Sequence, residues 1–482
     1  MPPTTSSRTV HPTVIVAILC ASGIAVSLMQ TMIVPLISTL PQILATSNSN
    51  AAWALTVTLL VGAITTPIGG RLGDMYGKKL VLLISVGGVV VGSVVCALSD
   101  GLALFLVGRG LQGIGVATIS LGISIMRDCV PPERLGKAVA AMSASLGVGG
   151  ALGLPIAAVI AQVTWHALFW VAAGFALACW LGIALIVPKA PGHRSAGFDY
   201  LGAVGLSVAL TALLLALSKG PTWGWTSVTT LSSFAIAAVV FALWGVYQWH
   251  RDHPLVDLRI NATRTVALTN VASVAAGFSM FAMTLIPVQI LMSPTATGTG
   301  NGLSMTTAGL LLAPGGLVMF ACSNIGARIT ARFGARHSLV TGGCVMAAGY
   351  IILLAMLVAG RHIDPWLMVV ISCITSGAIG IAYAAMPALI MSAVPLRQTG
   401  EANGVNALMR VLGTSVSSAV VGMVLAQYVT TLHLPTGHGT ITQAFPTSTA
   451  YTIAVVISLV ACAATVVSAL ALPKTAATGE IG

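Results

Sequence analysis

Long runs of apolar residues, separated by short polar breaks, recur from one end of the chain to the other. Each run is about as long as the roughly 20 residues that a helix needs to cross a bilayer core. Because lipid offers the backbone no hydrogen-bond partners, only helices or closed barrels span it, and runs this continuous favour helices. We therefore expect an all-α integral membrane protein with 14 transmembrane helices, at 13–37, 51–72, 80–98, 101–126, 136–161, 165–187, 199–218, 227–249, 266–292, 306–330, 338–359, 365–392, 401–425 and 449–472.

The composition supports this assignment. Hydrophobic residues make up 57% of the 482 positions and charged residues only 6%, and the mean hydropathy is +0.99. A water-soluble surface needs roughly a quarter of charged residues, so a soluble protein is excluded. The first run is too long for a signal-peptide core, and nothing like an A-x-A cleavage site follows it, so we expect it to be a retained span.

The positive charges indicate how the chain is oriented. Of the 21 Lys and Arg residues, Lys219 and Arg361 fall on one side and Arg109 and Arg410 inside spans, which leaves 17 on the other side. Basic residues are enriched in cytoplasmic loops, so we expect a multi-pass plasma-membrane protein with both termini in the cytoplasm. The net charge of +11 then reflects topology, and we expect no nucleic-acid partner.

An internal repeat divides the chain into two halves. The segment "GGRLGDMYGKK" (69–79) aligns with "GARITARFGAR" (326–336), and "VPPERLG" (130–136) aligns with "VPLRQTG" (394–400) in the same order. Two ordered matches predict two homologous six-helix halves. Transporter folds are commonly built from such repeats, with the substrate path between them.

The repeat sets the predicted organisation. We expect two pseudo-symmetric six-helix bundles, at 1–187 and 266–482, and a central two-helix insert with cytoplasmic linkers at 188–265. The hairpin 199–249 within this insert carries no charge in its interior and is predicted to lie outside the bundles.

Three motifs resemble a known family. Gly70, Asp74, Gly77, Lys78 and Lys79 resemble the signature loop of the major facilitator superfamily. "GRGLQGIGVA" (108–117), with Arg109, Gln112 and Gly113, resembles its fourth-helix motif, and "GVGGALGLP" (147–155) its fifth-helix antiporter motif. With fourteen spans, the chain is similar to the drug:proton antiporter branch. This resemblance implies a secondary active transporter that works by alternating access.

The chain departs from the branch pattern at two places. On the fifth span, Gly149, Gly153 and Pro155 form a helix-packing motif without the expected glycine directly before the proline. On the first span, Met29 or Gln30 stands where relatives usually carry an aspartate. The resemblance alone therefore leaves the position of proton coupling open.

Asp74 and Lys78 lie on the predicted loop between spans 2 and 3, and Asp128 lies at the predicted cytoplasmic end of span 4, where the three are expected to form a charged cluster. An aspartate near a helix amino terminus is stabilised by about 0.3–1 kcal/mol, and a nearby lysine adds a comparable amount if shielded. The cluster is predicted to be a proton-coupling site or a conformational latch, and the alternative is a set of solvated loop charges. Ala331 replaces the aspartate in the second copy, which confines the cluster to the first half.

Arg109 and Arg410 are the only charged residues well inside spans, and none of the ten acidic residues lies mid-span. A buried charge costs several kcal/mol unless it is paired or hydrated. We expect a polar cavity of positive potential that takes anionic, zwitterionic or neutral amphipathic solutes more readily than small cations. Arg109→Ala should then weaken anionic substrates most. The predicted lining is Met29, Gln30, Arg109, Gln112, Met280, Met283 and Arg410.

Other interpretations of these residues stay open. Arg109 and Gln112 are also consistent with structural hydrogen bonds to a neighbouring helix, Arg410 with a side chain that extends toward water, and each methionine with core packing.

No metal-ligand spacing, nucleophile elbow or phosphate-binding loop occurs, and the eight cysteines fall mostly inside spans. We therefore expect no enzyme, cofactor or metal. The predicted function is secondary transport of amphipathic small molecules, drugs or lipids, by proton-coupled efflux. The alternative is an uncoupled facilitator, importer or lipid mover. Membrane lipids, the substrate and protons are the expected partners, and a monomer is the expected state.

Overall fold

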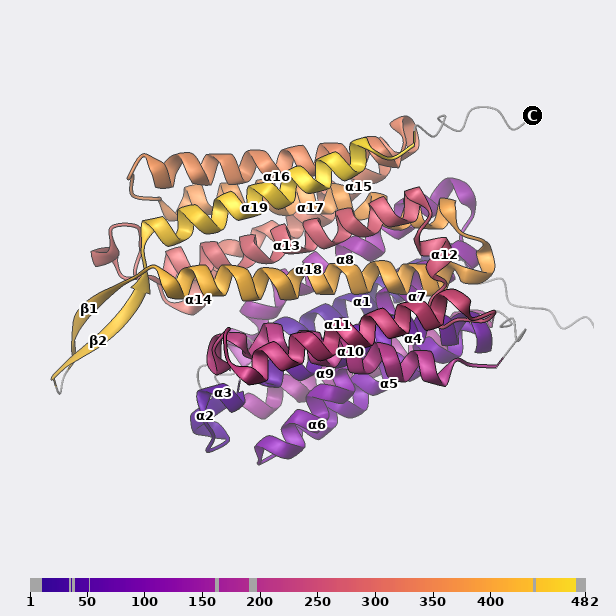
Figure 1. Cartoon of the computed structure of the whole chain (residues 1–482), viewed down its shortest axis with the longest axis horizontal. Helices are drawn as coiled ribbons and strands as arrows, with labels where there is room; N and C mark the ends of the chain where they lie inside the picture. Colours follow the sequence, from indigo (N-terminus) through magenta and orange to yellow (C-terminus); the bar gives the residue numbers. More distant parts are fainter. Residues whose placement is uncertain are drawn as a thin grey trace, which may run out of the picture.

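The computed structural model describes residues 11–473, apart from 34–35, 37–39, 52, 161–163, 190–196 and 437–438, and apart from the side chains of 48–49, 154–155, 158 and 433–443. Within this part of the chain, fourteen helices are long and apolar enough to cross a membrane, which confirms the predicted number. They lie roughly alongside one another (Figure 1).

The first half contains six spans. They are α1 (Pro12–Thr31), α4 (Trp53–Tyr76), α5 (Lys78–Ala97), α6 (Leu102–Gly113) continued by η2 (Ile114–Ala117) and α7 (Thr118–Cys129), α8 (Pro132–Ile160) and α9 (Trp165–Ile186); the short helices α2 (Leu40–Ile43) and α3 (Asn48–Ala51) join α1 to α4. The fourth span is thus not one continuous helix, because a 3₁₀ turn interrupts it.

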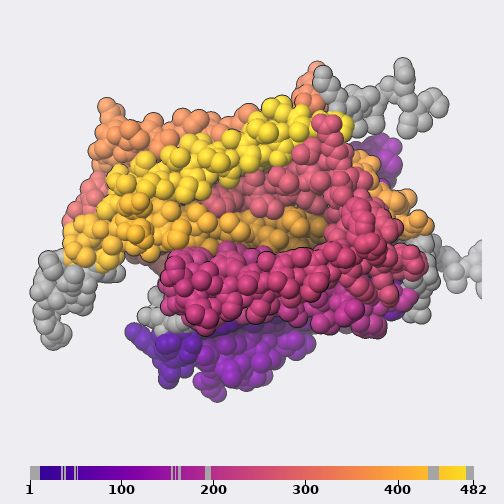
Figure 2. All heavy atoms as spheres, in the orientation of Figure 1, coloured from indigo at the N-terminus to yellow at the C-terminus, as the bar shows by residue number. Residues whose placement is uncertain are grey.

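The insert forms a helical hairpin of α10 (Tyr200–Trp223) and α11 (Val228–His250), followed by the one-turn helix α12 (Leu258–Asn261). Figure 2 shows the hairpin as a magenta band between the indigo and purple first half and the orange and yellow second half. α10 packs against both α4 and α18, whereas α11 packs mainly against α10. The insert therefore covers the line along which the halves meet.

The second half also contains six spans. They are α13 (Arg264–Met292), α14 (Met305–Leu312) continued by α15 (Pro314–Phe333), α16 (Ala335–Val358), α17 (Pro365–Ala393), α18 (Thr399–Gln427) and α19 (Ser448–Leu470), with short 3₁₀ turns η3 (Thr295–Thr297) and η4 (Leu396–Gln398).

A β-hairpin, which the hydrophobic pattern did not predict, joins α18 to α19. Its strands β1 (Val429–Thr436) and β2 (Gly439–Pro446) pair antiparallel, from Val429 opposite Pro446 to Thr436 opposite Gly439. The hairpin projects from one end of the helical bundle (Figure 1).

The two halves meet chiefly along two helix pairs, α4 with α18 and α8 with α15. We call these contacts the α4–α18 seam and the α8–α15 seam. The large apolar core of the second half is built from α13, α16, α17 and α19, and separate cores fill the first half. The seams are therefore the places where one half contacts the other without sharing a single large core.

Candidate functional site

The signature-like segment is almost entirely helical. α4 ends at Tyr76 and α5 begins at Lys78, so the connection is the single residue Gly77. Gly77 has a φ of 104°, a conformation that glycine adopts without steric cost. Asp74, which the sequence placed in a loop, instead lies in the last turn of α4, and this tight turn holds it beside Lys78.

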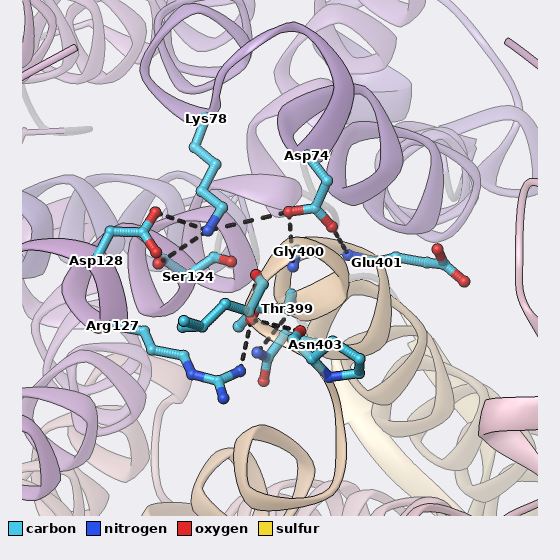
Figure 3. Close-up of polar contacts among 11 residues, drawn as sticks. Asp74, Lys78, Ser124, Arg127, Asp128, Thr399, Gly400, Glu401 and Asn403 are labelled. Atoms are coloured by element: carbon cyan, nitrogen blue, oxygen red, sulfur yellow. Dashed lines mark hydrogen bonds and ion pairs between the residues drawn. The ribbon is translucent and has the colours of Figure 1, made fainter. Parts of the chain in front are cut away.

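Asp74 caps a helix of the other half. Its Oδ1 accepts a hydrogen bond from the backbone N–H of Gly400 at 3.1 Å, and its Oδ2 accepts one from Glu401 at 2.9 Å (Figure 3). These N–H groups belong to the first turn of α18, where helix donors lack partners and the helix dipole favours negative charge. The carboxylate therefore links the two halves directly.

Glycines make this close approach possible. A Cβ atom at Gly400 would lie 2.7 Å from the carbonyl oxygen of Gly70 and 2.8 Å from Oδ1 of Asp74. A Cβ at Gly404, one turn further along α18, would lie 2.8 Å from the carbonyl oxygen of Thr66. Side chains at these positions would force α4 and α18 apart, so the α4–α18 seam depends on glycine for its geometry.

The structure brings the three predicted cluster residues together. Nζ of Lys78 lies 2.7 Å from Oδ2 of Asp128 and 4.0 Å from Oδ1 of Asp74. It also donates to the carbonyl of Ser124 at 3.4 Å. The Asp74 and Lys78 side chains are buried, and 24% of the Asp128 side chain is exposed. Lys78 therefore partly neutralises the negative charge of both carboxylates, and all three residues belong to the first half.

Two further contacts between the halves were missed by the sequence reasoning. Nη1 of Arg71 lies 3.2 Å from Oε2 of Glu401, whose side chain is only 3% exposed. Nη1 of Arg127 donates to Oγ1 of Thr399 at 2.6 Å (Figure 3). The sequence pointed to the first turn of α18 only through the second repeat match, "VPLRQTG" (394–400). That match ends at Gly400, one residue before Glu401.

The linker after the insert reaches the same point. The backbone N–H of Asp257 donates to Oε1 of Glu401. Leu255 and Val256 are buried in an apolar cluster that also contains residues of α4, α10 and α18. Glu401 is therefore held by the first half through Arg71 and by the linker through Asp257.

Asp199 fixes the insert at its base. Its carboxylate accepts hydrogen bonds from the backbone N–H groups of Gly202 and Leu255, from the Tyr247 hydroxyl and from the Gln248 amide, at 2.9–3.1 Å. Burial acts to raise the pKa of Asp199, but these hydrogen bonds outweigh it, and the pKa lies below its ordinary value. One ionised carboxylate thus joins α10, α11 and the linker.

Arg109 is sealed inside the first half. Its side chain is completely buried, its Nε donates to the Ala54 carbonyl at 3.0 Å, and its Nη1 donates to Oε1 of Gln112 at 2.6 Å and to the Met29 carbonyl at 3.3 Å. Gln112 in turn donates to Ser93 at 2.8 Å. These contacts tie α1, α4, α5 and α6 together, which is the structural interpretation that the sequence left open.

Arg410 has a different environment. Its Nη1 donates to Oδ1 of Asn406 at 2.7 Å, and its Cζ lies 5.4 Å from the centre of the Tyr383 ring. Asn406 donates to Asn270 and Ser273 on α13. The Arg410 side chain is only partly buried, so it is held from behind and open on one side.

The comparisons with known proteins decide the family. The model of the Major Facilitator Superfamily matches residues 19–418. The chain belongs to the Major Facilitator Superfamily. This confirms the resemblance that the three motifs carried and identifies the chain as a transporter rather than an enzyme.

Similar proteins include two that are named for drug resistance. The chain is 26% identical to multidrug resistance protein Stp of Mycobacterium tuberculosis (strain CDC 1551 / Oshkosh), over 80% of this chain and 70% of the relative. It is 27% identical to the tetracenomycin C resistance and export protein of Streptomyces glaucescens, over 80% of this chain and 70% of the relative. An uncharacterised transporter of Bacillus subtilis (strain 168), YvkA, is 28% identical, with 84% of this chain and 89% of the relative covered.

Solved structures show the same fold. The human organic anion transporter MFSD10 (TETRAN) superposes with a TM-score of 0.63 at 15% identity, with 95% of this chain and 99% of the other covered. The proton:xylose symporter XylE superposes with a TM-score of 0.64 at 15% identity, with 94% of each chain covered.

The remaining predicted residues of this superfamily transporter are distributed over both halves. Met29 packs in a small core of the first half, Met283 packs in the core of the second, and Met280 accepts a hydrogen bond from the Tyr383 hydroxyl through its sulfur. Gln30 is partly buried at the end of α1.

The predicted helix-packing glycines lie against α1. A Cβ at Gly149 would lie 2.7 Å from the Ile24 carbonyl oxygen, and one at Gly153 would lie 2.7 Å from Cβ of Thr31. The side chain of Pro155 is outside the described part of the structure. Among the described residues, no cluster of three His, Cys, Asp or Glu side chains is arranged to hold a metal ion.

Proposed function

We propose that this transporter exports amphipathic small molecules, drugs or lipids from the cytoplasm by proton-coupled alternating access. It resides in the plasma membrane as a monomer with both termini in the cytoplasm. The names of relatives such as Stp and the tetracenomycin C export protein support export. The observation that carries the proposal is the cap that Asp74 forms on α18 across the α4–α18 seam.

The cap makes the seam a conformational latch of Asp74, Lys78 and Asp128. A helix terminus without partners is costly, so α18 satisfies its first N–H groups with a carboxylate from the other half. In the state with these bonds, the halves are closed at the predicted cytoplasmic face. Cargo is released on the opposite side while these bonds hold. The return to the cytoplasmic-facing state requires the bonds to break, and the next closure requires them to re-form.

The proton step belongs to the same face. Asp74 and Glu401 are acids at the seam, Asp128 and Asp257 lie close to them, and none of the ten acids lies mid-span. Protonation of a buried carboxylate removes the charge that holds a helix dipole, so proton uptake here weakens the cap. Protons otherwise travel with the substrate itself.

The bundles 1–187 and 266–482 move against each other, with the insert 188–265 outside the substrate path. The contact of α10 with both α4 and α18 supports an outer position for the insert. The cargo site between the bundles is lined by Gln30, Met280 and Arg410, and the buried side chains of Met29, Arg109, Gln112 and Met283 support this lining from behind.

An uncoupled facilitator, importer or lipid mover is the second candidate. The lack of a mid-span carboxylate is the observation that favours it, because coupled transport through the core needs a group there that changes protonation.

Flux measurements in proteoliposomes distinguish the two. Purified protein is reconstituted, and accumulation of a fluorescent amphipathic dye is followed with and without an imposed pH gradient. Coupled export predicts accumulation that depends on the gradient and collapses with a protonophore. Equal flux under both conditions supports the facilitator, and no flux above protein-free liposomes contradicts both.

A further inference from the structure

Arg410 is an interior cation that has no counter-charge among the described residues. It lies on α18 nine residues after Glu401, which corresponds to about 14 Å along a helix. Glu401 is already paired with Arg71, and no Asp or Glu among the described residues lies within 4.0 Å of the Arg410 guanidinium. A guanidinium stays charged at any working pH, so the charge remains uncompensated.

The Arg410 guanidinium is held in one position. Oδ1 of Asn406 accepts from its Nη1, and the amide of Asn406 donates to Oδ1 of Asn270 at 3.0 Å and to Oγ of Ser273 at 2.8 Å. The orientation of the Asn406 amide is therefore fixed by both its ends. The Tyr383 ring lies 5.4 Å from Cζ, within the range of a cation–π contact.

Most of the guanidinium remains available. A guanidinium has five N–H donors, and in the described structure Arg410 makes one hydrogen bond. In the described structure, Nη2 of Arg109 is buried without a hydrogen-bond partner. No nitrogen atom of Arg410 is in that situation. The free donors of Arg410 therefore reach solvent-accessible space, whereas those of Arg109 do not.

We propose that Arg410, oriented by Asn406 and backed by Tyr383, binds an anionic oxygen group of an amphipathic ligand, such as a carboxylate or a phosphate monoester. A guanidinium presents its N–H groups in a planar fork that matches two oxygens of such an anion. Met280, whose sulfur contacts the hydroxyl of Tyr383, offers an apolar surface for the body of the ligand. The proposal rests on the transport function above, because it names the chemical class of the cargo.

Equilibrium binding of a matched pair of probes tests it. Dansyl-leucine carries a carboxylate, and dansyl-leucinamide has the same apolar body without the charge. Binding of each is measured by fluorescence to the full-length protein in neutral detergent, for the wild type, Arg410→Gln, Arg410→Lys and Tyr383→Leu. Arg361→Gln, an exposed arginine of the second half, removes the same charge elsewhere.

The wild type should bind dansyl-leucine more tightly than the amide. Arg410→Gln should weaken the carboxylate probe by roughly 10- to 100-fold, the range for a charge-assisted hydrogen bond, and leave the amide within about twofold. Arg410→Lys should restore part of the loss, since it keeps the charge but not the fork. Tyr383→Leu should weaken the carboxylate probe by a few-fold, and Arg361→Gln should change neither probe.

Equal losses for both probes in Arg410→Gln, or a wild type that does not prefer the carboxylate, would overturn the proposal. Because binding is measured without a gradient, this outcome is independent of the flux experiment. With dansyl-leucinamide as its dye, the flux experiment reports transport of a neutral cargo, whatever the role of Arg410. Competition with dihexanoyl phosphatidic acid distinguishes the source of the anion. Displacement of dansyl-leucine in the wild type identifies a lipid phosphate as a ligand, and its absence identifies a free carboxylate.

Discussion

Replacement of Asp74 by asparagine is the most direct test of the α4–α18 seam. Asn keeps one acceptor oxygen, so one of the two hydrogen bonds to Gly400 and Glu401 remains and the other is lost together with the charge. The fold within the first half should be little affected, because both hydrogen bonds act across the seam and Lys78 keeps its shorter ion pair with Asp128.

The structure sets the size of the effect. A hydrogen bond to a charged group contributes about 1.5–3 kcal/mol, and a carboxylate at a helix amino terminus about 0.3–1 kcal/mol more. We therefore expect Asp74→Asn to destabilise the closed seam by about 2–4 kcal/mol, which corresponds to a roughly 30- to 700-fold shift toward the open state. Such a shift should severely reduce transport while expression and folding stay nearly normal.

The shift can be measured without transport. On a background in which the eight native cysteines are replaced, Asn403→Cys places a single thiol on the buried first turns of α18. Its labelling by a membrane-impermeant maleimide then reports how often the seam opens, as long as opening and closing are fast. Asp74→Asn should raise the labelling rate by roughly 30-fold or more, up to that of the fully open state.

Asp128→Asn is the matched control. It removes the same charge, but its ion pair with Lys78 lies within the first half and is partly exposed. Such pairs contribute about 0–1 kcal/mol, so labelling should rise by no more than about fivefold. If Asp74→Asn labels at the wild-type rate and the protein is folded, the cap contributes nothing and the reasoning is wrong.

Three further outcomes follow from the same region. Gly404→Leu should disfavour the closed seam by about 1–3 kcal/mol, since its Cβ would meet the Thr66 carbonyl, and should raise maleimide labelling. Glu401→Gln should weaken the pairing with Arg71 by about 1–3 kcal/mol, and the loss is limited because Arg71 is partly exposed and stays hydrated. Flux should therefore fall less than for Asp74→Asn. Asp199→Asn should lower the Tm. Because the pKa of Asp199 is depressed, its stabilisation is complete above the unfolded value of about 3.9 and is lost only below it, so the Tm difference should be constant from about pH 5 to 8.

Much of the fold could be predicted from the sequence because the bilayer fixes the length of every span. One apolar run corresponds to one span in all fourteen cases among the described residues. The break at Ile114–Ala117 could not be seen, since a 3₁₀ turn and an α-helix bury the same apolar residues at this length. The β-hairpin after α18 lies outside the membrane pattern, so hydropathy carries no information on it.

The candidate site was predictable only in part. Asp74 and Lys78 are neighbours in sequence, so their proximity follows from the local turn, but Gly400 and Glu401 lie more than 300 positions away. Arg109 and Arg410 look alike as single arginines in apolar runs. Their difference is tertiary, since one is enclosed by carbonyls of neighbouring helices and the other is open toward solvent.

The α8–α15 seam provides the last prediction. Where the first half has Asp74, the second has Ala331, and the described contacts across this seam are apolar, as in the buried cluster of Ala140, Ala327 and Ala384. If the halves rotate as rigid bodies, breaking the polar seam must also open the apolar one. A thiol at Ala140→Cys should then gain labelling in Asp74→Asn by the same factor as the thiol at Asn403→Cys. An unchanged rate at Ala140→Cys, with a raised rate at Asn403→Cys, would mean that loss of the cap only loosens the first turn of α18. In that case the cap would stabilise a helix end without controlling the movement of the halves.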